Sequence, residues 1–211
     1  MSAPRPLQNR VDPWGRIVAA PERGRLMGNR GGRLHDDDKR LGTRGWTNKT
    51  WIACECAFRG RWREVMGAGY TELFFRDEPT ALAAGHRPCF QCRFVEAQAF
   101  QSAFAGLRPS AAQMDAVLHA ERLDPARLTR PLALLGLPDG VMVQGRDGAY
   151  LWAHGRLWRW SFGAYGPPET PPRGASLPVL TPASIVAALA GGYRPRGEGT
   201  PMATDETETR A

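Results

Sequence analysis

The sequence lacks the features that would place this chain in or across a membrane. It has no run of about eighteen apolar residues, which is the length needed to span a bilayer. Residues 1–10 contain no apolar core of the kind found in secretory signal peptides. We therefore expect a cytoplasmic protein with no membrane partner.

Cysteine and lysine are also scarce among the 211 residues. Four cysteines in a chain without a secretory signal favour metal or thiol chemistry over a disulfide framework. Only Lys39 and Lys49 are lysines, so arginine supplies nearly all of the positive charge. An apolar share of 42% and a charged share of 23% are typical of a globular protein, and they exclude a wholly disordered chain.

Positive charge exceeds negative charge, and the excess lies near the N-terminus. The chain has 28 Lys+Arg against 21 Asp+Glu, a net charge of +7. Residues 1–50, which are rich in Gly and Arg, hold most of this excess. Such a segment attracts polyanions through Coulomb forces and counterion release, so we predict a nucleic acid partner, most simply DNA. The arginines expected to contact phosphates are Arg25, Arg30, Arg33, Arg59, Arg61 and Arg63.

Local patterns predict an α+β fold with two antiparallel β-meanders. The first is expected over residues 51–58, 61–66 and 70–75, and the second over 141–144, 149–154 and 157–162. A further short strand is expected within 15–20. The predicted organisation is a basic Gly/Arg-rich arm at 1–48, a unit with a Cys-x-x-Cys knuckle at 49–108, a helix with the second meander and a closing helix at 109–195, and a disordered tail at 196–211.

Capping residues predict where the helices begin and end. Asp77 is expected to cap a short helix that ends at Gly85, and a longer helix is expected over residues 90–104. Ser110 and Gln113 form a capping-box pattern that opens the next helix. Further expectations are that Met114, Val117 and Leu118 face inward, and that Thr181 caps a last helix at Pro182–Ala190.

The most specific chemical signal is Cys89-x-x-Cys92 at a predicted helix start. Two thiolates at this spacing bind one metal ion, and helix N-terminal amides stabilise their negative charge. Cys54 and Cys56 lie at i and i+2 on a predicted strand, so both sulfurs are expected on one face. The four cysteines predict a Zn²⁺ site, with His86 as a substitute ligand. The alternatives are inert buried thiols and a redox dithiol at Cys89 and Cys92.

The segment around this cysteine pair resembles a known zinc module. Leu73-Phe74-Phe75 followed by Glu78–Arg93 is similar to the module of the Ada methylphosphotriester repair proteins, with its aromatic strand, Ala-rich helix and Arg-Pro-Cys-x-x-Cys knuckle. The resemblance implies that Cys89 and Cys92 are zinc ligands in a protein of DNA repair or processing. In that family an upstream Cys-x-x-x-Cys pair completes the site, and its first cysteine accepts a methyl group from a DNA phosphotriester. This chain has Cys54-x-Cys56 instead.

Two further groups of residues suggest catalysis less specifically. His35 with Asp36 to Asp38 would suit Mg²⁺ or Mn²⁺ in a nuclease, although a solvated acidic turn is the favoured interpretation. His119 and Glu121 would suit an acid–base pair, although surface residues are more usual at a helix end. No catalytic residue is assigned.

Tryptophan and arginine alternate near the C-terminal end of the second predicted meander. Trp152, Trp158 and Trp160 accompany Arg156 and Arg159, which would suit base stacking, but burial in a core is the favoured interpretation. The sequence therefore favours a zinc-containing, nucleic-acid-binding protein. A metal-dependent nuclease with structural zinc and a non-enzymatic protein-binding module are the alternatives.

Overall fold

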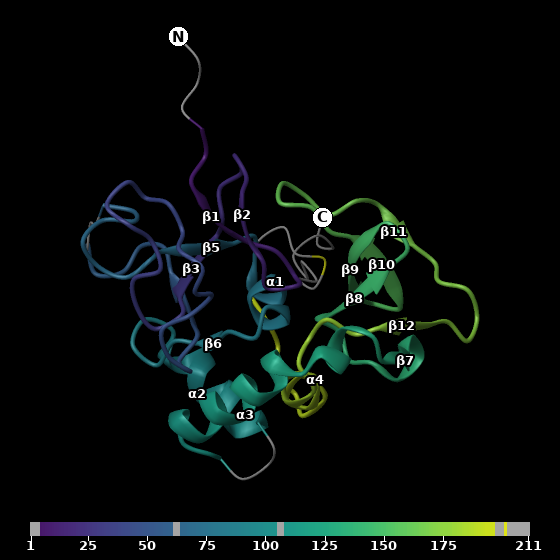
Figure 1. Ribbon diagram of the computed structural model, residues 1–211. Coiled ribbons are helices and arrows are strands. Elements are labelled where there is room, and N and C mark those ends of the chain that lie inside the picture. Colours follow the sequence, from purple (N-terminus) through teal and green to yellow (C-terminus); the bar gives the residue numbers. More distant parts are fainter. Residues whose placement is uncertain (1–4, 61–63, 105–107, 197–200, 202–211) are drawn as a thin grey trace, which may run out of the picture.

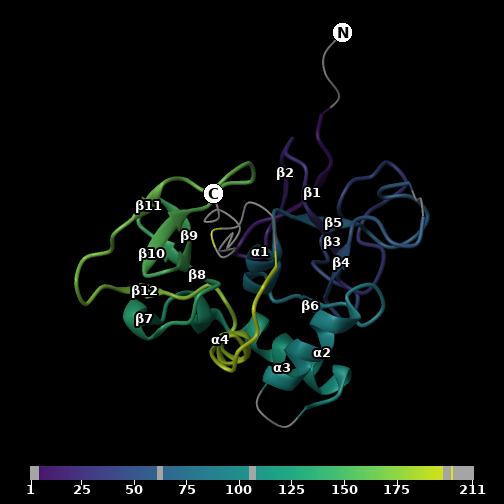
Figure 2. The ribbon, with the colours of Figure 1, turned by 180° about the vertical axis from the view of Figure 1, so that it is seen from behind.

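The computed structural model describes residues 5–60, 64–104, 108–196 and 201. Figure 1 shows one sheet formed by the first part of the chain, a second sheet on the opposite side, and helices packed below both. Seen from behind in Figure 2, helix α1 (Glu78–Ala83) lies between the two sheets. The combination of helices with mixed and antiparallel sheets confirms the predicted α+β class.

The first sheet has six strands, and it includes the segment that was expected to be an arm. Its spatial order is β2 (Ile17–Ala19), β1 (Gln8–Val11), β5 (Leu73–Phe75), β3 (Leu26–Asn29), β4 (Ile52–Glu55) and β6 (Arg87–Pro88). The β1–β5 and β4–β6 pairs are parallel, and the other pairs are antiparallel. Strand β2 confirms the short strand expected within 15–20.

The insertion of β3 between β4 and β5 contradicts the predicted first meander. Gly28 makes the insertion sterically feasible, because a Cβ there would lie 2.2 Å from the Ile52 carbonyl oxygen and 2.8 Å from the Phe75 ring. Part of the strand expected at 61–66 lies outside the described residues, and Glu64–Met66 is not in a strand. Met66 has a left-handed φ of 53°, and its amide donates to Glu72 at 2.7 Å.

The second sheet confirms the second predicted meander. It has the order β11 (Pro168–Glu169), β10 (Arg156–Arg159), β9 (Gly148–Ala153) and β8 (Val141–Gly145), and every pair is antiparallel. A two-stranded sheet joins β7 (Pro131–Ala133) to β12 (Ser176–Pro178). Short 3-10 helices occupy Pro125–Leu128 and Leu134–Gly136.

Two of the four predicted helix starts are confirmed. Asp77 caps α1 by accepting a hydrogen bond from the Thr80 amide, and Gly85 follows the helix with a φ of +79°. The Ser110–Gln113 capping box opens α3 (Ala111–Leu123).

The other helix predictions need correction. Helix α2 (Phe94–Ala103) begins after the cysteine turn instead of within it. Val117 is 43% exposed instead of facing inward, whereas Met114 and Leu118 are buried. Helix α4 (Ala183–Ala190) has Pro182 as its N-cap, because the Thr181 hydroxyl accepts the Met142 amide.

The largest hydrophobic cluster lies between helices α2, α3 and α4 and the second sheet. Trp152 belongs to this cluster and is buried, as the core interpretation predicts. Trp158 and Trp160 are half-buried against a neighbouring cluster, and the Trp160 indole donates to the Thr80 hydroxyl at 2.9 Å. None of the helices within the described ranges is long and apolar enough to cross a membrane.

Candidate metal centre

Three of the four cysteines form one cluster. The sulfurs of Cys54, Cys89 and Cys92 all lie within 4.8 Å of one another, close enough to hold a metal ion. Cys54 comes from β4, whereas Cys89 follows β6 and Cys92 lies in the turn before α2. The parallel pairing of β4 with β6 brings these segments together, and the Cys89 amide extends the ladder by donating to the Ala53 carbonyl at 3.0 Å.

The turn around Cys89 and Cys92 presents backbone amides to the sulfurs. The Gln91 amide donates to Cys89 Sγ and the Glu55 amide donates to Cys92 Sγ, each at 3.4 Å. Hydrogen bonds from amides favour the thiolate form, which is the form that ligates metals. The knuckle therefore supports negative charge before any ion binds.

Of the three thiols, Cys89 is the one whose surroundings favour the thiolate. A hydrogen bond from Cys54, together with backbone amides, lowers the pKa of Cys89 to about 5. The same hydrogen bond and burial raise the pKa of Cys54, and burial raises the pKa of Cys92. A divalent cation would let all three sulfurs ionise, because its charge offsets their mutual repulsion. The donor set thus fits a soft or borderline metal ion such as zinc.

Cys56 does not join the cluster, in contrast to the sequence prediction. The i, i+2 argument requires an extended strand at both positions, but β4 ends at Glu55. The Cys56 sulfur is exposed and lies 3.3 Å from the Arg25 carbonyl oxygen. His86 is not a substitute ligand either, because its buried ring packs 4.6 Å from Phe75 instead.

A polar cavity is lined in part by the residues that directly follow Cys54 and Cys92 in the chain. It has a volume of about 690 Å³ and is lined by Arg25, Leu26, Glu55, Asp77, Glu78, Arg93 and Arg196. Glu55 and Arg93 link it to the cluster, since each is next to a cysteine in the chain. Arg93 donates to Glu78 at 2.7 Å, and both side chains are buried. The cavity therefore has walls of mixed charge, fixed by a buried ion pair.

The second metal site suggested by the sequence is not formed. The His35 ring is buried, with Nδ1 2.6 Å from the Thr71 hydroxyl and Nε2 2.9 Å from the Gly67 carbonyl oxygen. The carboxylates of Asp36 to Asp38 are exposed and bind elsewhere: Asp37 pairs with Arg33, Asp38 pairs with Arg40, and Asp36 accepts the Arg40 amide. Within the described parts of the chain, the three cysteines form the one cluster of potential metal ligands. The segment is a solvated acidic turn.

His119 and Glu121 do not form an acid–base pair. Glu121 accepts hydrogen bonds from the amide and hydroxyl of Ser184, at 3.0 and 2.7 Å, in the first turn of α4. The His119 ring instead lies edge-on to Trp46, with centroids 5.6 Å apart. Residues two apart on a helix point in different directions, which separates the two side chains.

The predicted phosphate-binding arginines differ in exposure. Arg25, Arg33 and Arg59 are exposed, whereas Arg30 is buried and cannot reach a polyanion at the surface in this conformation. Arg61 and Arg63 lie outside the described residues. Only some of the arginines predicted to bind phosphate are therefore exposed on the surface.

Comparisons of the chain with protein-family models, with curated proteins and with solved structures find no match. The resemblance to the Ada-type module rests on the residues of the knuckle and stays a prediction.

Sequence analysis missed several buried polar residues that shape the region. Glu78, Arg93 and Tyr193 form one network, and Arg122 packs on Trp51. No local motif joins these positions, which are far apart in the chain. The one available signal was the Arg-rich composition, and it does not show which arginines become buried.

Proposed function

We propose that this chain is a zinc protein that binds nucleic acid and acts in DNA repair or processing. The observation that carries the proposal is the convergence of Cys54, Cys89 and Cys92 within 4.8 Å. Zinc takes four ligands, so three cysteines leave one position for water or a substrate atom. The sulfurs lie in an apolar shell that includes Met27 and Phe74, which limits competition from solvent.

The nucleic acid partner is supported by charge. The net charge is +7. Exposed Arg25 and Arg33 lie on either side of β3, and exposed Arg59 follows β4, the strand that carries Cys54. Phosphate contacts of this kind supply affinity without sequence readout. The Ada-type resemblance of the knuckle points to the same class of partner.

Metal content of the purified, reduced protein tests the zinc site. Elemental mass spectrometry is expected to find about one zinc per chain in the wild type. Cys54→Ser, Cys89→Ser and Cys92→Ser should each lose it, whereas Cys56→Ser is the matched control and should keep it. Zinc-free wild-type protein, or zinc retained by Cys54→Ser, would overturn the three-cysteine site.

Fluorescence anisotropy with labelled single-stranded and duplex DNA tests the partner. Affinity is expected to fall linearly with salt on a log–log scale, because bound phosphates release counterions. Absent or salt-independent binding by zinc-loaded protein would contradict the nucleic acid partner and leave the zinc site standing.

A further inference from the structure

Two arginines pack against one buried tryptophan. Trp51 directly precedes β4 and is 6% exposed. The guanidinium carbon of Arg30 lies 4.0 Å from its ring centroid, and that of Arg122 lies 4.2 Å away. Arg30 directly follows β3 and Arg122 comes from α3, so the contact exists only in the folded chain.

Both arginines hydrogen-bond to neutral groups instead of carboxylates. Arg30 donates to the carbonyls of Gly15 and Gly45 at 2.7 and 3.4 Å, and Arg122 donates to those of Leu118 and Lys49 at 2.8 and 3.1 Å. Among the residues described, no carboxylate forms an ion pair with either guanidinium. Arg30 Nε also donates to Nε2 of His86 at 3.4 Å, so the two guanidinium groups donate to backbone carbonyls and one imidazole nitrogen.

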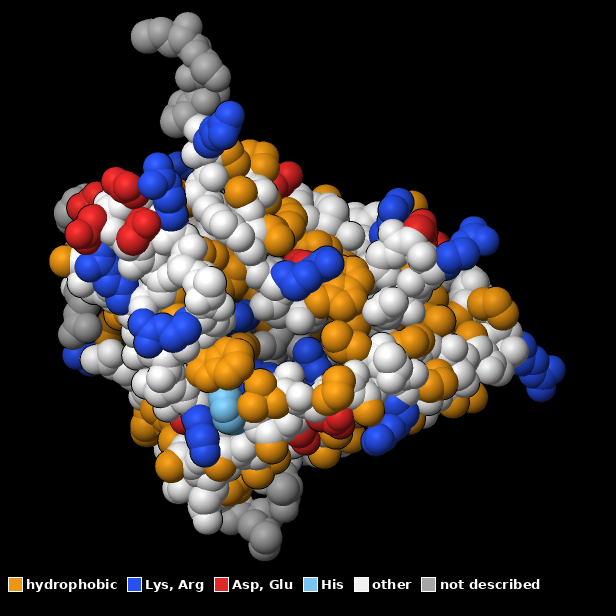
Figure 3. All heavy atoms as spheres, viewed as in Figure 1, with side chains coloured by type: hydrophobic (Ala, Val, Ile, Leu, Met, Phe, Trp, Pro, Cys, Tyr) orange, Lys and Arg blue, Asp and Glu red, His pale blue; other side chains and the backbone are white. Residues whose placement is uncertain are grey.

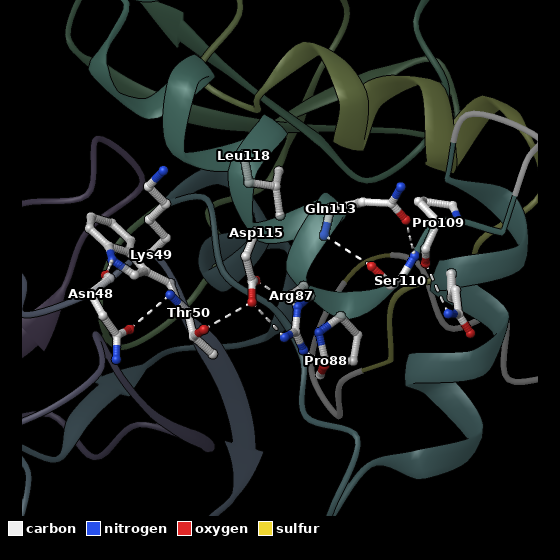
Figure 4. Close-up of polar contacts among 12 residues, drawn as sticks. Asn48, Lys49, Thr50, Arg87, Pro88, Pro109, Ser110, Gln113, Asp115 and Leu118 are labelled. Carbon is white, nitrogen blue, oxygen red and sulfur yellow. Dashed lines mark hydrogen bonds and ion pairs between the residues drawn. The ribbon is translucent and has the colours of Figure 1, made fainter.

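Both acids of α3 are already occupied. Glu121, next to Arg122 in the chain, accepts two hydrogen bonds from Ser184. Figure 4 shows the Asp115 carboxylate between Arg87 and Thr50, with the Lys49 side chain pointing away from it. Arg87 binds Asp115 through two hydrogen bonds of 2.8 and 2.9 Å, and the Thr50 hydroxyl donates at 3.0 Å. The Asp115 carboxylate therefore forms its ion pair with Arg87, and it acts on Arg122 only as a nearby charge.

Burial and neighbouring positive charges make both cations unfavourable. Burial, followed by the charge of Arg122, lowers the pKa of Arg30 to about 9. Burial is also the main reason that the pKa of Arg122 falls to about 10. An arginine stays protonated near neutral pH, so the shifts measure how strongly this environment disfavours positive charge. An external anion would relieve that penalty.

Two nitrogen atoms on the same face of α3 lack a hydrogen-bond partner among the described residues. They are the buried atoms Arg122 Nη1 and His119 Nδ1, and residues three apart on a helix are neighbours. Lys49 is exposed, and its charge and that of Arg122 both act on His119. Half-buried Arg122 and exposed Lys49 thus place two positive charges beside the His119 ring.

An exposed aromatic ring completes the site. Trp46 is 38% exposed, with its ring 5.6 Å from His119 and 6.1 Å from Trp51. Figure 3 shows basic side chains in and beside a hollow on this face of the molecule, next to a histidine and apolar side chains. A partly exposed aromatic ring beside two positive charges suits a ligand with both a phosphate and a planar base.

We propose that Trp46, Lys49, His119 and Arg122, backed by Trp51 and Arg30, bind a nucleotide unit of single-stranded nucleic acid. The phosphate would contact Arg122 and Lys49, and the base would stack on Trp46. The residues of the site fit a phosphate and a base, and the choice of a nucleic acid instead of a free nucleotide rests on the proposed function. The metal centre and this site share a strand, because β4 carries Cys54 and directly follows Trp51.

The test uses zinc-loaded, full-length protein with a short fluorescein-labelled oligothymidylate. Trp46→Ala removes an exposed ring and is expected to weaken binding about tenfold. Lys49→Gln should weaken it a few-fold and reduce the salt slope by about one. Lys39→Gln is the matched control, since the only other lysine is ion-paired with Glu64 at 2.7 Å, and it should change neither quantity. Zinc content and circular dichroism verify that each variant is folded.

The outcomes separate this site from the proposed function. If Trp46→Ala and Lys49→Gln weaken oligonucleotide binding and Lys39→Gln does not, the result supports both the site and the nucleic acid partner. Wild-type binding that none of the variants changes overturns the site and leaves nucleic acid binding intact. Tryptophan fluorescence that responds to thymidine monophosphate but not to oligonucleotide, with the response lost in Trp46→Ala, supports the phosphate-and-base site and contradicts the nucleic acid partner. Wild-type protein that binds none of oligonucleotide, mononucleotide and inorganic phosphate overturns the site.

Discussion

The hydroxyl of Tyr193 donates a 2.5 Å hydrogen bond to Oε1 of Glu78, a carboxylate that is fully buried at the start of α1. Oε2 of the same carboxylate accepts from Arg93 at 2.7 Å and from the Arg196 amide at 2.8 Å. Glu78 therefore connects the residue after the cysteine knuckle to the segment that follows α4. One buried acid thus joins the middle of the chain to the segment near its C-terminus.

We expect this network to contribute strongly to stability. Glu78→Ala leaves Arg93 buried without its principal partner, which typically costs about 3–5 kcal/mol. Tyr193→Phe removes one hydrogen bond to a charged group and should cost about 1–3 kcal/mol. Urea denaturation measures both, and exposed Glu169→Gln serves as the control. A Glu78→Ala free energy of unfolding equal to that of the wild type would contradict the role of the network.

A pair of glycine substitutions isolates the packing of Arg122. Gly85 and Gly155 have similar left-handed φ angles of +79° and +68°, so alanine is strained at both, by about 1–2 kcal/mol. A Cβ at Gly85 would also lie 2.7 Å from Cγ and Cδ of Arg122, whereas one at Gly155 meets nothing within 4 Å. Gly85→Ala should therefore cost more than Gly155→Ala and displace Arg122. Denaturation curves compare the two, and equal costs would show that Arg122 moves freely.

Acid should weaken the fold through His86. Burial, then the charges of Arg30 and Arg122, hold the pKa of His86 well below its usual value of 6.5. Below pH 6.5 the unfolded chain binds a proton that the folded chain does not, so stability falls by about 1.4 kcal/mol per pH unit. The contribution is fully present above pH 6.5. Free energies of unfolding between pH 5 and 7 should show a smaller slope in His86→Gln, whereas His154→Gln, an exposed imidazole, should keep the wild-type slope.

Zinc should protect three cysteines from alkylation. In the loaded protein, iodoacetamide is expected to modify exposed Cys56 and to spare Cys54, Cys89 and Cys92, because coordinated thiolates are poor nucleophiles toward it. A zinc chelator should make these three reactive and lower the melting temperature, since metal binding is coupled to folding. Intact-mass and peptide-mass measurements count the modified sites. Identical modification with and without chelator would contradict coordination.

Features encoded by neighbouring residues were predictable from the sequence. The Asp77 cap, the Ser110–Gln113 capping box and the second meander depend on contacts within a few residues or across a tight turn. The pairing of Cys89 with Cys92 is equally local, because two residues of spacing bring both sulfurs to one turn. These predictions agree with the structure because local interactions form in the same way wherever the distant parts of the chain lie.

Other features were decided only by tertiary contacts. The insertion of β3 between β4 and β5 depends on Gly28, which allows close backbone approach to a strand far along the chain. Cys56 is excluded from the metal cluster because the sheet ladder ends one residue earlier, at Glu55. The stacking of Arg30 and Arg122 on Trp51 joins segments with no common motif. Composition establishes that the chain is rich in arginine, but burial and long-range packing determine which guanidinium groups lack an anion.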